Sequence, residues 1–241
     1  MVFLVGLPRK SGGRVFQRDG FVVTLRGRAG DSLANYQSRS LEVLTQLKLE
    51  DEVNHDLLIG DYEDTYYNLT LKMMHSFQWA SSSCVPQKPT FVFMDDDFAF
   101  NMDKLRQVIA NRTESTRGQM AIGDVRRAYP THRHGRAPEY EKWSFSKREV
   151  PWPVLAPHTS GSFYVFGYEI VEEIAAAMYF MAPLPLDDVW LGVIVTKLRI
   201  TYELLPGLYQ YFNPKLHHRK DALFAPFEVL FPIQHDRFGY V

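Results

Sequence analysis

Three consecutive carboxylates, Asp95, Asp96 and Asp97, directly follow the short apolar run Phe91–Met94. Asp95 and Asp97 are two residues apart, so both can face one cation, and carboxylate oxygens suit Mg²⁺ or Mn²⁺. A divalent ion held by one or two carboxylates commonly shares its remaining positions with phosphate oxygens. The pattern therefore indicates a metal site that receives a diphosphate substrate.

Two other interpretations of the three aspartates stay open at this point. Aspartate is favoured in solvated turns and at helix N-caps, so the run is also consistent with a plain surface turn. Phosphatases that form an aspartyl phosphate place Asp-x-Asp after a strand as well, but the Thr or Val pattern that generally follows is not found in DDDFAF. A surface turn seldom follows so apolar a run, which favours the metal–diphosphate interpretation.

A second acidic pair, Asp187-Asp188, follows a loop that contains proline and precedes the apolar segment 189–198. An aspartate at a helix start caps exposed N–H groups and suits the helix dipole, which accounts for one of the two. The other is available for chemistry. A metal that stabilises a departing diphosphate and a carboxylate that accepts the proton of an incoming hydroxyl together make a group-transfer site.

The elements that must position these carboxylates alternate between strands and helices. Apolar runs predict strands at 3–6, 21–25, 56–60, 91–94, 119–125 and 163–166, and helical periodicity predicts helices at 31–52, 66–80, 102–110, 168–181 and 189–198. This alternation predicts one α/β domain over residues 1–241 with a mainly parallel sheet. Phe91–Met94 reads as a strand in the middle of that sheet, with the aspartates at its carboxyl end, where ligands bind.

Composition excludes several classes of protein. A 46% hydrophobic and 14% aromatic composition supports a folded core, and a net charge of -1 gives no indication of a nucleic-acid partner. Cys84 is the single cysteine, which excludes an internal disulfide and a cysteine-rich metal site. No apolar stretch reaches the roughly 18 to 20 residues that span a bilayer. His132 and His134 lie in a polar loop without a nearby carboxylate or cysteine partner, so we expect them to be solvent-exposed.

Several stretches together resemble the β-1,3-glycosyltransferases, which transfer galactose, N-acetylglucosamine or N-acetylgalactosamine from UDP. Order and spacing match over about residues 56–200, and the branch that extends lactosylceramide is the most similar. The matching stretches are FLVG at 3–6, DLLIGDYEDTYYNLTLK at 56–72, Trp79, Cys84, FVFMDDDFAFN at 91–101, Lys142-Trp143, Ser160-Gly161-Ser162 and LDDVWLG at 186–192.

The resemblance implies a GT-A type fold, a Golgi membrane protein facing the lumen, and Mn²⁺-dependent inverting transfer from a UDP-sugar to a β-galactoside or other glycan acceptor. It implies that Asp95 and Asp97 bind Mn²⁺ together with a late histidine, for which His235 is the nearest candidate and His217 or His218 are alternatives. It further implies a catalytic base at Asp188, next to Asp187. Implied contacts to the donor are Asp95, Asp96, Lys142, Trp143 and Gly161.

The match also departs from the family. The membrane anchor, the stem and a basic segment with the first strand, which in the family precede FLVG, are missing from this sequence, and residues 8–40 match poorly. We therefore expect an N-terminally truncated domain that has lost a strand beside uridine. A catalytically inactive protein that binds UDP or sugar is the alternative function.

Overall fold

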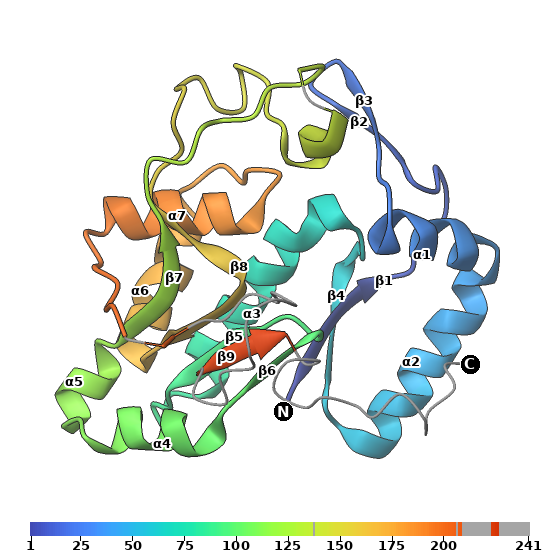
Figure 1. The fold of residues 1–241 in the computed structure, drawn as a ribbon. Helices are drawn as coiled ribbons and strands as arrows, with labels where there is room; N and C mark the ends of the chain where they lie inside the picture. The colour runs from blue at the N-terminus through green and yellow to red at the C-terminus, as the bar shows by residue number, and fades with distance from the viewer. Residues whose placement is uncertain (137, 206, 209–222, 227–241) are drawn as a thin grey trace, which may run out of the picture.

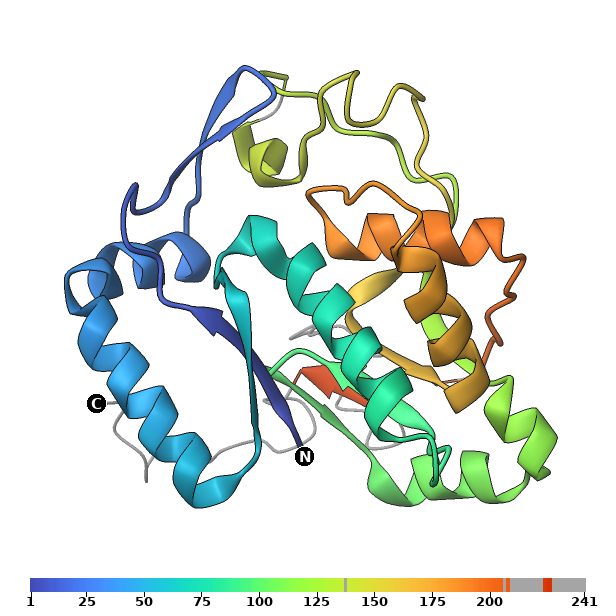
Figure 2. The same ribbon diagram turned by 180° about the vertical axis from the view of Figure 1, so that it is seen from behind.

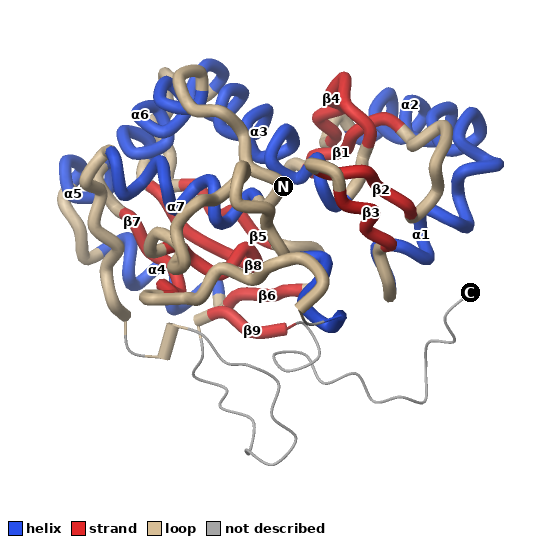
Figure 3. Tube along the Cα trace, turned by 90° about the horizontal axis from the view of Figure 1, so that it is seen from above, coloured by secondary structure: helices blue, strands red, loops and turns tan. Residues whose placement is uncertain are grey.

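The computed structural model describes residues 1–136, 138–205, 207–208 and 223–226 of the 241-residue chain. Two groups of elements lie side by side, and helix α3 (Leu69–Ser83) runs between them (Figures 2 and 3). The first group precedes α3 in the sequence, and the second follows it (Figure 1). No helix in the described part of the chain is long and apolar enough to cross a membrane.

The first group contains one parallel strand pair and one hairpin. Strand β1 (Phe3–Leu7) pairs with β4 (Leu57–Glu63), and β2 (Val15–Arg18) pairs antiparallel with β3 (Phe21–Thr24). The predicted helix 31–52 is two helices, α1 (Arg28–Tyr36) and α2 (Ser40–Asn54), separated by a 3₁₀ turn. The polar stretch QSRS at 37–40 interrupts the apolar spacing there, so nothing in the core holds a single straight helix.

The second group is built on a three-stranded sheet with the order β5–β8–β7. Strand β8 (His158–Phe166) lies in the middle and runs antiparallel to both β5 (Phe91–Met94) and β7 (Ala121–Arg126). The expectation of a mainly parallel sheet is therefore wrong for this sheet. Strands β5 and β7 do run in the same direction, but the excursion over 127–157 returns the chain as an antiparallel strand between them. An apolar run cannot distinguish these two arrangements.

Strand β5 is also not the central strand that its apolar sequence predicted. It pairs with β8 alone among the described strands, and all four of its residues are half-buried. Its apolar side chains are covered on both faces by helices and by the pair formed by β6 (Phe98–Phe100) and β9 (Phe224–Pro226). A covered edge strand and a central strand produce the same sequence pattern.

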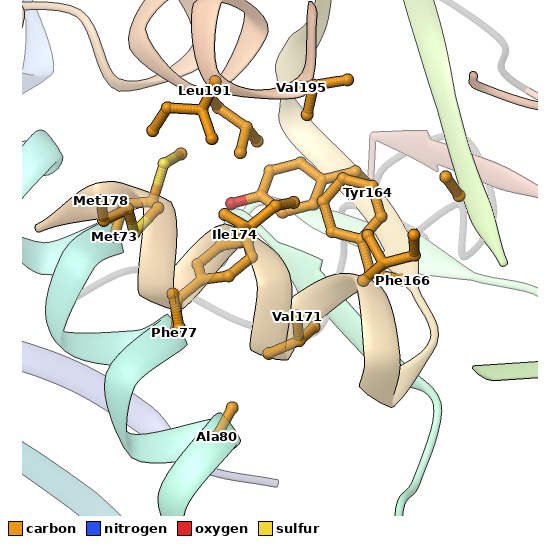
Figure 4. Close-up of a cluster of buried hydrophobic side chains, with 14 of the residues drawn as sticks. Met73, Phe77, Ala80, Tyr164, Phe166, Val171, Ile174, Met178, Leu191 and Val195 are labelled. Atoms are coloured by element: carbon orange, nitrogen blue, oxygen red, sulfur yellow. The ribbon is translucent and has the colours of Figure 1, made fainter. Parts of the chain in front are cut away.

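Alternate side chains of β8 serve two hydrophobic clusters, as the period of a strand requires. Tyr164 and Phe166 face α3, α6 (Tyr168–Met178) and α7 (Asp187–Lys197), where Phe77 and Ile174 are fully buried (Figure 4). Phe163 and Val165 face the opposite cluster, which includes residues of α4 (Met102–Ala110). The short helix α5 (Glu114–Gly118) leads from α4 into β7. The sheet thus has a packed layer on each face, and this holds the carboxyl end of β5 in place.

An upper layer, made of β2, β3 and the described residues of 127–157, lies above α7 in Figure 1. Arg18 of the hairpin is buried and donates to the Ser144 carbonyl at 3.2 Å and to Glu149 Oε1 at 3.0 Å. Inside this layer, Phe145, Val150 and Leu155 pack with Leu186 and Val189, the residues on either side of the second acidic pair. The upper layer therefore covers the start of α7.

Candidate active site

The three aspartates after β5 form the turn that leads into β6. The Asp95 N–H donates to the Ser162 carbonyl at 2.9 Å, which continues the pairing of β5 with β8, and the Phe98 N–H donates to the Asp95 carbonyl at 3.2 Å. All three residues keep solvent-exposed surface. The turn interpretation is therefore right for the backbone, while the carboxylates stay accessible to a ligand.

Asp187 and Asp188 occupy the first turn of α7. The neighbouring side chains Leu186, Val189 and Trp190 are buried, so the start of this helix is held firmly in the core. The Val189 N–H donates to Asp188 Oδ1 at 2.7 Å, which satisfies one free donor of the first turn. In contrast to the first acidic run, this pair is half-buried.

The fold brings these two acidic centres within electrostatic reach of each other, although Asp97 and Asp187 are 90 positions apart in the sequence. Burial raises the pKa of Asp95 to about 7, and the charges of Asp187, Asp97 and Asp96 add to this effect. Burial and the charge of Asp188 raise the pKa of Asp187 to about 7. Asp95 keeps an exposed edge, so water weakens these effects there more than at Asp187. Excess negative charge of this kind attracts a cation.

One lysine lies close enough to oppose this charge. Lys72 Nζ on α3 is 2.9 Å from Asp64 Oδ1, and Asp64 Oδ2 accepts the Gly6 N–H at 2.9 Å. The charge of Lys72 lowers the pKa of both Asp95 and Asp187. Through Asp64, the end of β1 and the start of α3 are thus joined beside the acidic cluster.

A second cation, Arg28, contacts the exposed part of the acidic run. Its Nη2 lies 3.0 and 3.2 Å from the two carboxylate oxygens of Asp96, and its Nη1 lies 3.5 Å from Asp97 Oδ2. Arg28 is the first residue of α1 and follows Gly27, whose φ of 67° favours glycine. The N-terminal group of elements therefore supplies a positive side chain to the predicted metal ligands.

Lys142 and Trp143, both predicted to contact the donor, lie beside Tyr66. The Trp143 Nε1–H donates to the Tyr66 hydroxyl at 2.8 Å. Lys142 Nζ lies 4.4 Å from the centre of the Trp143 ring and 5.3 Å from that of Tyr66, and burial lowers the pKa of Lys142. Burial raises the pKa of Tyr66, and the charges of Asp187 and Asp188 raise it further. This aromatic group is thus within electrostatic reach of the second acidic pair.

Gly161, another predicted donor contact, lies against Asp188. A Cβ built on Gly161 would approach the Asp188 Cβ to 3.6 Å, an ordinary van der Waals contact. Burial raises the pKa of Asp188, whereas its hydrogen bond from Val189 and the charge of Arg126 lower it. A carboxyl group with a raised pKa holds a proton more readily near neutral pH, which suits a general base.

The structure does not bring together every predicted ligand. In the described ranges, no three or more His, Cys, Asp or Glu side chains form a group that could hold a metal ion. His235, His217 and His218 lie outside the described residues. Any metal bound by Asp95 and Asp97 would therefore need further ligands from a substrate or from the part of the chain that is not described.

The prediction for His134 is wrong. Its side chain is 1% exposed, its Nδ1 lies 2.6 Å from Glu141 Oε1, and its ring stacks on Phe21 at 4.3 Å. His132 is half-buried and stacks on Tyr140 at 4.4 Å. The carboxylate partner follows seven residues later in the sequence, and the 3₁₀ helix Pro138–Trp143 brings it back. Within the upper layer, His134 joins the hairpin to the segment 127–157, a role that a polar loop sequence does not reveal.

Sequence reasoning assigned no role to Tyr66, Lys72 or Arg28. Tyr66 and Lys72 lie in the stretch DTYYNLTLK, whose amphipathic pattern directed attention to its apolar stripe. A lysine within that pattern, soon after the acidic segment DYED at 61–64, was the available signal. Arg28 gave no signal, because its contact with Asp96 joins residues 68 apart through an irregular segment.

Comparisons with known proteins agree on one family. The family model described as galactosyltransferase matches residues 37–206. The mouse (Mus musculus) protein "Beta-1,3-galactosyltransferase 5" is 30% identical over 168 residues, which are 70% of this chain and 52% of the relative.

Two further relatives carry other transferase names. The human (Homo sapiens) "Lactosylceramide 1,3-N-acetyl-beta-D-glucosaminyltransferase" is 28% identical over 66% of this chain and 41% of its own length. The pig (Sus scrofa) "UDP-GalNAc:beta-1,3-N-acetylgalactosaminyltransferase 1" is 26% identical over 77% of this chain and 54% of its own length. The chain thus spans about half the length of the curated relatives it matches.

Proposed function

Because the chain belongs to the galactosyltransferase family, we propose that it transfers a hexose from a UDP-sugar, in β-1,3 linkage, to a glycan acceptor. The observation that carries this proposal is the convergence of the exposed run Asp95–Asp97 with the enclosed pair Asp187–Asp188. The first centre is suited to stabilising a charged leaving group, and the second is suited to accepting a proton. Transfer with inversion at the anomeric carbon needs these two functions at adjacent places.

The residues present fit a divalent cation at the first centre. Asp95 and Asp97 offer hard oxygen ligands. Burial and the nearby charges of Asp187, Asp97 and Asp96 raise the pKa of Asp95, and a positive charge would relieve that repulsion. Among the described residues, no three side chains form a complete set of metal ligands, so oxygens of the donor diphosphate would complete the coordination. When bound, Mn²⁺ would stabilise the charge that develops on the leaving UDP.

The chain's own residues then perform the proton transfer. We assign Asp188 as the base that accepts the proton of the acceptor hydroxyl, while the bond from that oxygen to the anomeric carbon forms and the bond to UDP breaks. Its raised pKa favours proton uptake. Asp187 interacts electrostatically with both Asp188 and Asp95, and we propose that it orients the acceptor between the two centres. We propose Trp143 and Lys142, which lie against Tyr66, and Gly161, which lies beside Asp188, as contacts to the donor.

Donor and acceptor are proposed at the level of chemical class. The relatives' names include galactosyl, N-acetylglucosaminyl and N-acetylgalactosaminyl transfer. The donor is therefore proposed to be UDP-Gal, UDP-GlcNAc or UDP-GalNAc, and the acceptor a β-galactoside or related glycan on lipid or protein. By the same resemblance, we propose the Golgi lumen as the place of action.

The test is an activity screen on the purified chain with Mn²⁺. Each of the three donors is incubated with lactose and with an N-acetylglucosaminide, UDP release is measured, and the product linkage is determined by mass spectrometry and NMR. We expect one donor to give a β-1,3-linked product. Binding of UDP is measured in parallel by calorimetry with Mn²⁺ and with EDTA, and Asp97→Asn is the matched variant that should lose metal-dependent binding. UDP binding without turnover would instead support an inactive binding protein. A chain that shows no UDP binding and no turnover would overturn both the transferase and the binding protein.

A further inference from the structure

The contact between Arg28 and the acidic run is not part of the transfer chemistry described above. The guanidinium group reaches both oxygens of Asp96 and one oxygen of Asp97, at 3.0 to 3.5 Å. Of the described residues, Arg28 is the cationic side chain in ion-pair contact with Asp96 and Asp97. It precedes the segment 37–206 that matches the family, so family membership assigns it no role.

This ion pair is too exposed to hold the fold together. The side chains of Arg28, Asp96 and Asp97 are 70%, 71% and 59% exposed, respectively. Water and salt screen such pairs strongly, and their net contribution to stability is small. The guanidinium can therefore leave the carboxylates at little cost if a better anion becomes available.

Two ligands of the proposed reaction would act on this contact in opposite ways. A divalent cation that binds Asp97 competes with the guanidinium for the same carboxylate and is repelled by its charge. A diphosphate at the same place adds anionic oxygens, and the planar fork of arginine pairs with such oxygens in a bidentate manner. Arg28 should thus hinder the metal alone and assist the nucleotide.

We propose that Arg28 exchanges partners during substrate binding: it neutralises Asp96 and Asp97 in the absence of ligand and moves to the diphosphate when the nucleotide binds. The proposal rests on the proposed function, because it requires the diphosphate to lie beside Asp95 and Asp97. It makes Arg28 a substrate-binding residue supplied by the N-terminal group of elements. It also predicts that a divalent cation binds weakly without nucleotide.

The test measures the affinities of Arg28→Gln for Mn²⁺ and for UDP and compares the direction in which each differs from the wild type. Binding of Mn²⁺ alone is followed by the EPR signal of the free ion, and we expect Arg28→Gln to bind it up to about five-fold more tightly, as the loss of an exposed ion-pair competitor allows. Binding of UDP at saturating Mn²⁺ is followed by calorimetry, and we expect it to weaken by about ten-fold, the size typical of a lost charge-assisted hydrogen bond.

Two control variants separate exchange from a general effect of charge. Arg14→Gln removes another arginine of the same region, whose side chain is 51% exposed and pairs with Asp31 at 3.6 Å, and it should leave both affinities unchanged. Arg28→Lys keeps the charge without the fork, so it should keep the low affinity for Mn²⁺ alone while losing part of the affinity for UDP.

The outcomes distinguish this proposal from the proposed function. Opposite changes in the two affinities of Arg28→Gln support the exchange. Unchanged affinities, or two affinities that fall together, overturn the exchange while leaving metal-dependent UDP binding of the wild type intact. A wild-type chain that binds neither Mn²⁺ nor UDP overturns the proposed function, and the exchange with it.

Discussion

The two acidic centres share a sequence pattern but differ in their surroundings. Asp95–Asp97 follow an edge strand, lie in a turn and are exposed, with Arg28 on the solvent side. Asp187 and Asp188 begin a helix whose flanking residues are buried beneath the upper layer. Consecutive aspartates next to an apolar segment therefore do not define a single kind of site. Whether solvent or buried side chains surround the carboxylates decides whether they suit an exchangeable ligand or a proton.

In the proposed function, exposure of Asp96 and Asp97 would let a cation enter and leave the first centre together with the substrate. Enclosure raises the proton affinity of the second centre and fixes its orientation through the first turn of α7. A transferase needs both properties, one to release UDP after each turnover and one to accept a proton. The predictions below test whether this division is real.

The largest expected effect is on turnover at the enclosed centre. Asp188→Asn should lower turnover by about 100- to 10,000-fold, because a general base is typically worth that much. UDP affinity at saturating Mn²⁺ should stay nearly unchanged, since the base does not hold the diphosphate. Steady-state kinetics at saturating donor and calorimetry with UDP measure the two quantities.

Asp187→Asn is the matched variant for this measurement and should lower turnover less. If Asp187→Asn abolishes turnover and Asp188→Asn does not, the two roles are exchanged. If neither variant affects turnover, the enclosed pair is structural and the comparison between the two centres fails as an account of catalysis.

The second prediction concerns the pH dependence of stability at the enclosed pair. The pKa of Asp187 is raised from 3.8 to about 7 in the folded protein, so folding favours its protonated form. Its stabilising contribution is therefore fully present below about pH 4 and is lost as the pH rises through about 7. We expect Asp187→Asn to be more stable than the wild type at pH 8, by at least about 1 kcal/mol given the size of one pKa unit.

Denaturant unfolding of both proteins at pH 5, 6, 7 and 8, without metal, measures this difference. The advantage of Asp187→Asn should grow between pH 5 and pH 8. Asp96→Asn is the control at the exposed centre and should show no such growth, because Asp96 is 71% exposed. A pH-independent difference for Asp187→Asn would mean that the carboxyl is ionised throughout and not effectively enclosed.

Sequence reasoning identified the elements and the acidic centres well and their surroundings poorly. The predicted strand Phe91–Met94 and helix Met102–Ala110 are confirmed with the same bounds, because each pattern is strong and local. The edge position of β5 and the antiparallel direction of β8 could not be predicted, since both depend on where the chain returns after 127–157. The burial of His134 depends on Phe21 and Glu141, and only folding brings these residues together.

For the candidate site, too, the sequence predicted local features better than long-range surroundings. Asp95 and Asp187, which the sequence placed at separate centres, do lie within electrostatic reach of each other. Burial raises the pKa of Asp95, Asp187 and Asp188, and at Asp95 the charge of the distant Asp187 adds to this effect. Lys72 and Arg28 also reach this region from far away in the sequence. Local sequence patterns do not predict which charged side chains from distant parts of the chain lie beside a site.

The smallest expected effect tests whether the enclosed centre is held more firmly than the exposed one. Tyr66→Phe keeps the ring among Leu186 and Val189 but removes the hydroxyl that accepts the Trp143 Nε1–H at 2.8 Å. The half-buried indole N–H then lacks its partner, which should cost about 1 kcal/mol of stability. Arg28→Gln, at the exposed centre, should change the free energy of unfolding by less than about 0.5 kcal/mol. Urea unfolding of Tyr66→Phe, Trp143→Phe and the double variant measures the coupling between the two side chains, which should be about 0.5 to 1 kcal/mol. Additive effects of Tyr66→Phe and Trp143→Phe would show that the aromatic pair does not stabilise the enclosed centre. A larger loss of stability from Arg28→Gln than from Tyr66→Phe would show that the enclosed centre is not held more firmly than the exposed one.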